Sequence, residues 1–184
     1  MSIAPKRRWF HVGNDAGDRS LDQQLVGLAR LFDVCKGRSV LDLGCAEGLI
    51  SMELVKAGAT AAHGIEVVPE HVTLGRKLVG DLPVTLECAD LNTWRPTASY
   101  DIVIALALLH KLKDPSAGCA AFCEAAKDLM VIRTPPKVDP WVIVDQRSGR
   151  KPHDIGKVLA GNGFKLKLQV EGTFGEVIGY WGRA

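Results

Sequence analysis

The stretch VLDLGCAEGLI, residues 40–50, decides the fold of this chain. It opens with an apolar run broken only by Asp42, which is typical of a buried strand, and Gly44 then permits a tight turn. A helix is expected to follow from Glu47 to Ala57, where Gly58 supplies a stop signal. In an open α/β sheet, a strand, a glycine turn and a helix in this order form the place that binds a nucleotide-like ligand.

Three acidic side chains lie near the ends of the first three predicted strands. Asp42 belongs to the first strand, Glu66 lies near the end of the second, and Asp90 follows the third. The carboxyl ends of parallel strands meet at one edge of a sheet, so these acids are expected to outline a single crevice.

The glycine spacing favours S-adenosylmethionine over a dinucleotide in this crevice. Dinucleotide sites use Gly-x-Gly-x-x-Gly and a helix N-terminus to hold a diphosphate. Here the pattern is Gly44-x-Ala46-x-Gly48, and Glu47 stands where the helix is expected to begin. A carboxylate at that point would repel a diphosphate. The sulfonium and ammonium groups of S-adenosylmethionine would instead be attracted by acids in a partly desolvated cleft.

Four motifs of the chain resemble those of the class I S-adenosylmethionine-dependent methyltransferases. They are residues 40–48, 64–67, 88–91 and 100–110, and the resemblance extends from about residue 39 to the C-terminus. It implies an α/β fold with a doubly wound, mainly parallel seven-stranded sheet between two helix layers. The implied strand order is 3-2-1-4-5-7-6, with an antiparallel C-terminal hairpin. One departure is Ala46, where the family usually has glycine.

The resemblance also implies roles for the residues around the crevice. Asp42 would face the methionine end of the cofactor directly or through an ordered water. Glu66 would accept hydrogen bonds from both ribose hydroxyls, and Asp90 would accept one from the adenine amino group. Val67 and Leu91 would cover the two faces of the adenine, with ordinary core packing as the alternative for both. The other expected cofactor contacts are Gly44, Cys45, Ala46, Gly48 and Ala105.

His110 is the candidate catalytic residue. It is expected to close the fourth strand, beside the methyl group, where a neutral imidazole could take a proton from the attacking nucleophile. The alternative is a histidine that caps the strand or orients the following loop. Methyl transfer by a single displacement can also proceed by alignment alone, without a base.

The chain is interpreted as a single domain, residues 1–184, in three parts. Residues 1–38 form an N-terminal cap and helix, residues 39–133 bind the cofactor, and residues 134–184 form a substrate-side connection and the closing strands. Helices are expected at 21–34, 69–80, 116–126 and 154–162, and strands at 39–43, 61–67, 84–88, 101–106, 129–133, 164–170 and 176–181.

The methyl acceptor is expected to lie among three segments of the chain. These are the N-terminal segment with Trp9, Phe10 and His11, the loop after His110, and an irregular proline-rich connection up to about Pro152. Further candidates for its lining are Arg133 and Trp141.

Composition and charge place the chain among globular proteins. Of its 184 residues, 47% are apolar and 24% are charged, and its net charge of +2 neither demands nor excludes a polyanionic partner. The five cysteines lack Cys-x-x-Cys spacing, so reduced thiols in the cytoplasm are expected and no metal site is predicted. No signal peptide is recognised, and the longest apolar run, residues 102–109, is too short to span a membrane.

We therefore predict a methyltransferase that passes a methyl group from S-adenosylmethionine to an oxygen or nitrogen atom of a small molecule. An RNA or protein methyltransferase is one alternative, weakened by the near-neutral net charge. The other is a non-catalytic partner subunit with the same fold. A nicotinamide dehydrogenase is the least favoured interpretation, and the oligomeric state is left open.

Overall fold

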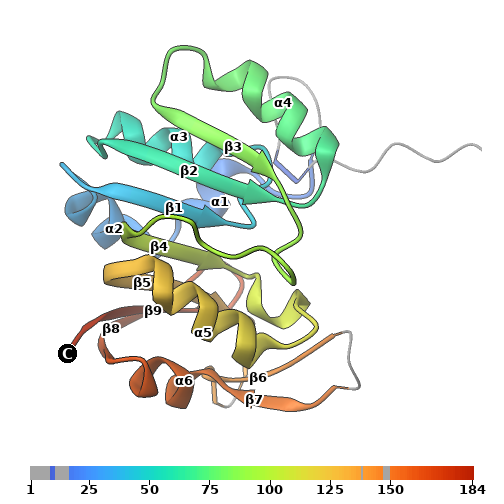
Figure 1. Ribbon diagram of the computed structural model, residues 1–184, viewed down its shortest axis with the longest axis vertical. Helices are drawn as coiled ribbons and strands as arrows, with labels where there is room; N and C mark the ends of the chain where they lie inside the picture. The colour runs from blue at the N-terminus through green and yellow to red at the C-terminus, as the bar shows by residue number, and fades with distance from the viewer. Residues whose placement is uncertain (1–8, 11–16, 138, 147–149) are drawn as a thin grey trace, which may run out of the picture.

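A twisted sheet of seven strands forms the centre of the structure, a computed structural model that describes residues 9–10, 17–137, 139–146 and 150–184. The strand order is β3-β2-β1-β4-β5-β9-β8, which Figure 1 shows from top to bottom. The strands are β1 (Ser39–Leu43), β2 (Ala61–Glu66), β3 (Val84–Cys88), β4 (Tyr100–Leu106), β5 (Ala126–Thr134), β8 (Phe164–Glu171) and β9 (Val177–Arg183). β1 to β5 are parallel, whereas β9 is antiparallel to both β5 and β8. The predicted strand order and the predicted C-terminal hairpin are confirmed.

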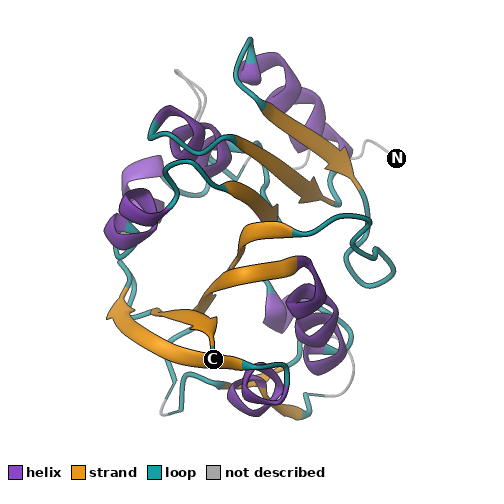
Figure 2. Ribbon diagram, turned by 60° about the vertical axis from the view of Figure 1, so that its left-hand side comes forward, coloured by secondary structure: helices purple, strands orange, loops and turns teal. Residues whose placement is uncertain are grey.

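Helices cover both faces of the sheet (Figures 1 and 2). One layer holds α1 (Leu21–Leu25), α2 (Ala29–Val34), α3 (Leu49–Lys56) and α4 (Pro69–Val79), and the other holds α5 (Pro115–Ala125) and α6 (Ile155–Gly161). Successive side chains of a strand point to opposite faces, so Val40 packs in the first layer and Leu41 in the second. Asp42 shares the face of Val40 and points toward α3, where Ser51 donates a hydrogen bond to it.

The expected helix over residues 21–34 is interrupted, which corrects the sequence prediction. Gly27 has φ +80°, and a Cβ there would lie 2.6 Å from the Ile178 side chain and 2.8 Å from the Glu171 carbonyl oxygen. The break leaves backbone carbonyl groups without helical partners. Tyr180 donates its hydroxyl to the Gly27 carbonyl at 2.8 Å, and Arg133 donates to the Gln24 carbonyl. These tertiary hydrogen bonds compensate the broken turn.

The helix after the glycine turn begins two residues later than predicted. Gly48 is its N-cap and has φ +77°, a left-handed conformation that cannot belong to a right-handed helix. α3 therefore starts at Leu49, and Glu47 belongs to the turn instead of the helix.

The segment after β4 also differs from the prediction. β4 ends at Leu106, Ala107 has φ +55°, and the short 3₁₀ helix η1 spans Leu109–Lys111. His110 therefore lies on this helix and does not close the strand.

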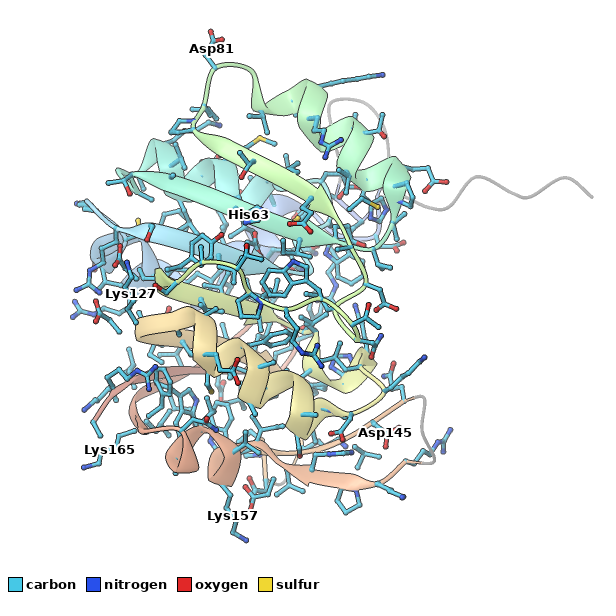
Figure 3. The ribbon with its side chains drawn as sticks, in the orientation of Figure 1. His63, Asp81, Lys127, Asp145, Lys157 and Lys165 are labelled. Carbon is cyan, nitrogen blue, oxygen red and sulfur yellow. The ribbon has the colours of Figure 1, made fainter. Side chains whose placement is uncertain are left out.

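The proline-rich connection is not wholly irregular. It contains β6 (Val142–Val144) and β7 (Pro152–Asp154), which pair antiparallel in a separate two-stranded sheet. Asp145, labelled in Figure 3, follows β6, is buried, and accepts a hydrogen bond from the Lys151 N–H at 2.8 Å. The Gln146 N–H donates to the His110 carbonyl at 2.9 Å, so this small sheet is tied to η1.

Among the described residues, no helix is both long and apolar enough to cross a membrane.

Candidate functional site

A cleft of about 440 Å³ lies where the carboxyl ends of β1, β2, β3 and β4 meet. This is the position predicted from the glycine turn and the strand-end acids. The cleft is lined by Trp9, Gly44, Ala46, Glu66, Val67, Val68, His71, Asp90, Leu91, Asn92, Leu106, Ala107, Leu108, Lys111 and Leu112.

The glycine turn is held against the end of β2 by backbone hydrogen bonds. The N–H groups of Gly44 and Cys45 donate to the Ile65 carbonyl at 2.8 and 3.1 Å. Gly44 has φ +75°, and a Cβ there would lie 3.1 Å from the Leu108 side chain. Ala46 has φ +50°, a left-handed conformation that costs an alanine about 1–2 kcal/mol more than a glycine. The usual glycine of the motif is thus replaced, but its backbone conformation is kept.

Glu66 connects this turn to the start of the segment after β2. Its side chain accepts one backbone hydrogen bond on each oxygen, from Ala46 at 3.1 Å and from Val68 at 2.9 Å. The residue is largely buried but lines the cleft. Each carboxylate oxygen can accept a second hydrogen bond, so both can still receive the hydroxyls of a vicinal diol.

Asp42 lies beneath the turn and does not itself line the cleft. It is buried, and its Oδ2 accepts a hydrogen bond of 2.6 Å from the Ser51 hydroxyl of α3. Burial raises the pKa of Asp42 to about 6, the Ser51 hydrogen bond opposes this rise, and the nearby Glu66 adds to it. The ionised carboxylate is therefore costly in the free protein, and a cation in the cleft would stabilise it.

The raised pKa predicts how Asp42 affects stability. The folded pKa of about 6 exceeds the unfolded value of about 3.9, so the wild type loses stability as pH rises through this window. We expect Asp42→Asn to abolish this loss, worth up to about 3 kcal/mol at full ionisation. Thermal unfolding should be measured at about pH 4.5 and about pH 8. The stability of the variant relative to the wild type should be greater at the higher pH.

Asp101 provides a control of opposite sign. Hydrogen bonds from the Ser39 N–H and hydroxyl lower its pKa, so its contribution to stability is present above the unfolded pKa and is lost as pH falls. The stability that Asp101→Asn loses relative to the wild type should therefore be greatest at the higher pH. Parallel pH curves for wild type and Asp42→Asn would refute the assignment of Asp42.

The end of the cleft near β3 combines apolar surface with a hydrogen-bond acceptor. Val67 is 55% exposed, whereas Leu91 is 6% exposed, and both line the cleft. Asp90 lines it as well, and its Oδ1 accepts from the N–H and side-chain amide of Asn92 at 2.9 and 2.7 Å. An exposed valine, a leucine and a carboxylate provide what a flat, apolar ring with an amino group requires.

Four of the predicted cofactor residues do not line the cleft. Asp42 lies beneath the turn, whereas Cys45 and Gly48 belong to the turn, and a Cβ at Gly48 would lie 3.0 Å from the Leu86 side chain. Ala105 is fully buried in the core beside α5. The roles of these four residues in cofactor binding stay predictions. The cleft wall along β4 is formed instead by residues 106–108.

His110 is outside the cleft lining too. It is buried, and this burial lowers its pKa to about 4, helped by the nearby Lys111 and Lys137. The imidazole is therefore neutral at pH 7, as a base must be, but its low pKa makes it a weak base.

Two residues suggested for the acceptor pocket have structural contacts. Arg133 is fully buried, donates to Gln24 Oε1 at 2.8 Å, and has its Nε 3.8 Å from Glu176 Oε2. Trp141 packs edge-on against Trp181, with ring centroids 5.0 Å apart. Neither Arg133 nor Trp141 lines the cleft. His11 lies outside the described residues.

Sequence reasoning missed several contacts of the cleft. His71 and Lys111 line it, and Glu47 is fully buried with its carboxylate turned to the backbone of Trp9 and Phe10. Glu47 therefore cannot repel a diphosphate in the way the sequence argument assumed. Its position could not be read from the sequence, because the partners lie 38 and 37 residues away.

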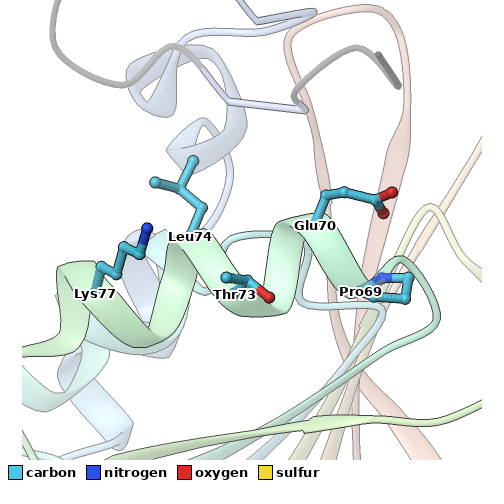
Figure 4. Close-up of a pocket in the computed structure, with 5 residues that line it drawn as sticks. All are labelled: Pro69, Glu70, Thr73, Leu74 and Lys77. Atoms are coloured by element: carbon cyan, nitrogen blue, oxygen red, sulfur yellow. The ribbon is translucent and has the colours of Figure 1, made fainter. Parts of the chain in front are cut away.

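A second hollow of about 380 Å³ lies along α4 (Figure 4). It is lined by Pro69, Glu70, Thr73, Leu74 and Lys77. All five belong to one helix, and none was predicted as a site residue. The cleft at the glycine turn is therefore the candidate site. Among the described residues, no group of His, Cys, Asp and Glu is placed to hold a metal ion.

Comparison with known proteins identifies the class. Residues 40–129 match the model of the methyltransferase domain family. The structure resembles that of magnesium protoporphyrin IX methyltransferase from Synechocystis, solved with bound S-adenosylmethionine, with a TM-score of 0.71 and 22% identity over 89% of this chain and 80% of that one. An S-adenosylmethionine-dependent methyltransferase from Mesorhizobium loti gives a TM-score of 0.70 and 16% identity over 88% of this chain and 98% of that one. Residues 40–129 therefore match a methyltransferase domain, and the fold is that of solved S-adenosylmethionine-dependent methyltransferases.

Curated relatives share parts of this chain. A ubiquinone biosynthesis O-methyltransferase from Coxiella burnetii is 27% identical over 124 residues, which cover 64% of this chain and 49% of the relative. A ribosomal protein L11 methyltransferase from Laribacter hongkongensis is 31% identical over 81 residues, which cover 44% of this chain and 27% of the relative. The chain thus spans less than half of the length of these two relatives.

Proposed function

We propose that this protein transfers a methyl group from S-adenosylmethionine to an oxygen or nitrogen nucleophile of a small molecule. One observation carries the proposal: Glu66, Asp90 and the exposed Val67 converge on one cleft beside the glycine turn. A ribose diol, an adenine amino group and an adenine face require these three kinds of side chain.

The residues of the cleft fit this cofactor. Glu66 would hold the ribose, Asp90 the adenine amino group, and Val67 with Leu91 the adenine ring. When bound, the cofactor supplies an electrophilic methyl group on a sulfonium. Asp42 lies beneath the turn and, once ionised, would favour the cationic form of the ligand.

The chain's contribution to the reaction is positioning and exclusion of water. Leu106, Leu108 and Leu112 give the cleft an apolar wall. Such a wall would keep water from the reacting atoms and hold the acceptor in line with the methyl group.

The acceptor class is supported by the relatives. The ubiquinone and protoporphyrin methyltransferases are named for small molecules. The similarity to an L11 methyltransferase makes a protein acceptor the second candidate.

A labelled methyl donor distinguishes these acceptors. The protein would be incubated with methyl-labelled S-adenosylmethionine and separate low-mass, protein and RNA fractions of a cell extract, with Glu66→Ala as the control. We expect label in the low-mass fraction. Label in the protein or RNA fraction alone would favour the macromolecular alternatives. No transfer despite cofactor binding would favour a non-catalytic subunit.

The role of His110 as a base is also a proposal. We expect His110→Ala to lower turnover of an identified acceptor by roughly 10²-fold, the lower end for a general base, with cofactor affinity similar to the wild type. Because the pKa of His110 is about 4, its protonation should not limit turnover above about pH 5. Steady-state kinetics across the neutral pH range tests this, and unchanged turnover would leave His110 with only a structural role beside β6.

A further inference from the structure

The buried side chain of Glu47 joins two parts of the chain that are distant in sequence. Its Oε1 accepts the Trp9 N–H at 3.0 Å and lies 3.7 Å from His71 Nε2, and its Oε2 accepts the Phe10 N–H at 3.3 Å. Glu47 is fully buried, and a fully buried carboxylate is retained only where hydrogen bonds compensate its desolvation. Both oxygens are thus used to hold the backbone of residues 9–10.

The same two residues are held from a second side. The Trp9 carbonyl accepts the N–H groups of Asp18 and Arg19, both at 3.0 Å, and Phe10 forms a β-bridge with Arg19. The Phe10 side chain is buried in the core beside α3. Residues 9–10 are therefore fixed to the body of the protein on both sides of their backbone.

The consequence of this fixation is the position of the Trp9 side chain. Trp9 lines the cleft together with Gly44 and Ala46. The Lys111 ammonium lies 4.6 Å from the centre of the indole, and the Arg19 guanidinium lies 5.7 Å from it. These two cations restrict the ring further, since both are within cation–π range.

Glu47 is also next to the turn residue that contacts Glu66. The Ala46 N–H donates to the Glu66 carboxylate, and the following residue, Glu47, holds Trp9. The proposed ribose-binding acid and the wall formed by Trp9 are therefore connected through two consecutive residues of one turn.

We propose that Glu47 is a positioning residue: its carboxylate fixes Trp9 as a wall of the cleft and thereby sets how long the adenosyl ligand stays bound. This inference rests on the proposed function, because it takes the adenosyl group as the occupant of the cleft. The role follows from the contacts that Glu47 makes with residues 9–10.

Two measurements test the proposal. The first is amide hydrogen exchange at Trp9 and Phe10, which needs no ligand. We expect both amides to be protected in the wild type, to exchange freely in Glu47→Ala, and to be intermediate in Glu47→Gln, which keeps one acceptor oxygen. The second is the dissociation rate of S-adenosylhomocysteine, measured by stopped flow. We expect it to rise about tenfold in Glu47→Ala, since losses at a binding site fall mostly on dissociation.

Two further variants separate the effect of fixing the backbone of residues 9–10 from the effect of the Trp9 side chain as a wall of the cleft. Trp9→Ala keeps its backbone N–H, so it should speed ligand dissociation while the Phe10 amide stays protected. Glu53→Ala removes an acid of α3 that is paired with Lys56 on the surface, and it should change neither measurement.

The outcomes distinguish this inference from the proposed function. If wild type binds S-adenosylhomocysteine but Glu47→Ala dissociates at the same rate, the positioning role is refuted. If the Trp9 and Phe10 amides exchange equally in wild type and Glu47→Ala, the fixation itself is refuted. If wild type binds no adenosyl ligand, the proposed function is refuted, and the role of Glu47 in ligand retention is refuted with it. The hydrogen-exchange data would still show whether Glu47 fixes residues 9–10.

Discussion

Replacing Glu66 by alanine is expected to weaken the binding of S-adenosylmethionine by about 1–3 kcal/mol, or roughly 5- to 150-fold. The variant loses two charge-assisted hydrogen bonds to the proposed ribose. It also releases the N–H groups of Ala46 and Val68, which the carboxylate holds in the free protein. Isothermal titration calorimetry of the purified variant measures this loss directly.

Glu70→Ala is the matched control for this experiment. Glu70 lies in the first turn of α4, close to Glu66 in sequence, but it lines the second hollow along α4 instead of the cleft. The control variant should bind the cofactor as wild type does. An affinity for Glu66→Ala equal to that of wild type would remove Glu66 from the site.

Replacing Arg133 by methionine is expected to destabilise the fold by about 3–5 kcal/mol, lowering the melting temperature by roughly 10 °C. The Arg133 side chain is fully buried and donates to both the side chain and the carbonyl of Gln24. Its removal leaves the buried Glu176 carboxylate paired with Arg19 at 3.2 Å but without the second guanidinium. The carbonyl groups at the helix break near Gly27 would also lose the hydrogen bonds that Arg133 donates to them.

Two further variants check the origin of the Arg133 effect. The double variant Arg133→Met with Glu176→Gln should lose less than the sum of the single losses, because the Glu176 charge that Arg133 partly compensates is gone. Arg38→Met breaks an exposed pair with Asp128 and should cost no more than about 1 kcal/mol. A melting temperature for Arg133→Met equal to that of wild type would show that the buried network does not stabilise the fold.

Most of the fold could be predicted because its strands carry local signals. The apolar run of β1 and the glycine turn after it need no distant partner to be recognised, and Pro69 marks the first residue of α4 as expected. The break at Gly27 could not be predicted, because it depends on contacts with β8 and β9. The sequence pattern had indicated one continuous helix over residues 21–34.

The candidate site, like the fold, could be predicted only in part. Glu66, Val67, Asp90 and Leu91 line the cleft as expected, because the end of each parallel strand fixes where its last residues lie. His110 was misplaced, since the left-handed Ala107 turns the chain into a 3₁₀ helix before the histidine.

Glu47 was misread as a rim acid for a different reason. Its hydrogen-bond partners are the backbone N–H groups of Trp9 and Phe10, and nothing in the local sequence around the glycine turn indicates them. Contacts between segments this far apart depend on the packing of the whole fold.

The assignment of the cleft to an adenosyl methyl donor is tested most directly by calorimetric titration of the purified wild type. The ligands would be S-adenosylmethionine, S-adenosylhomocysteine and, as a control, NAD. We predict binding of both adenosyl ligands in the micromolar range and none of NAD. Binding of NAD, or a flat titration with both adenosyl ligands, would contradict the assignment of the cleft.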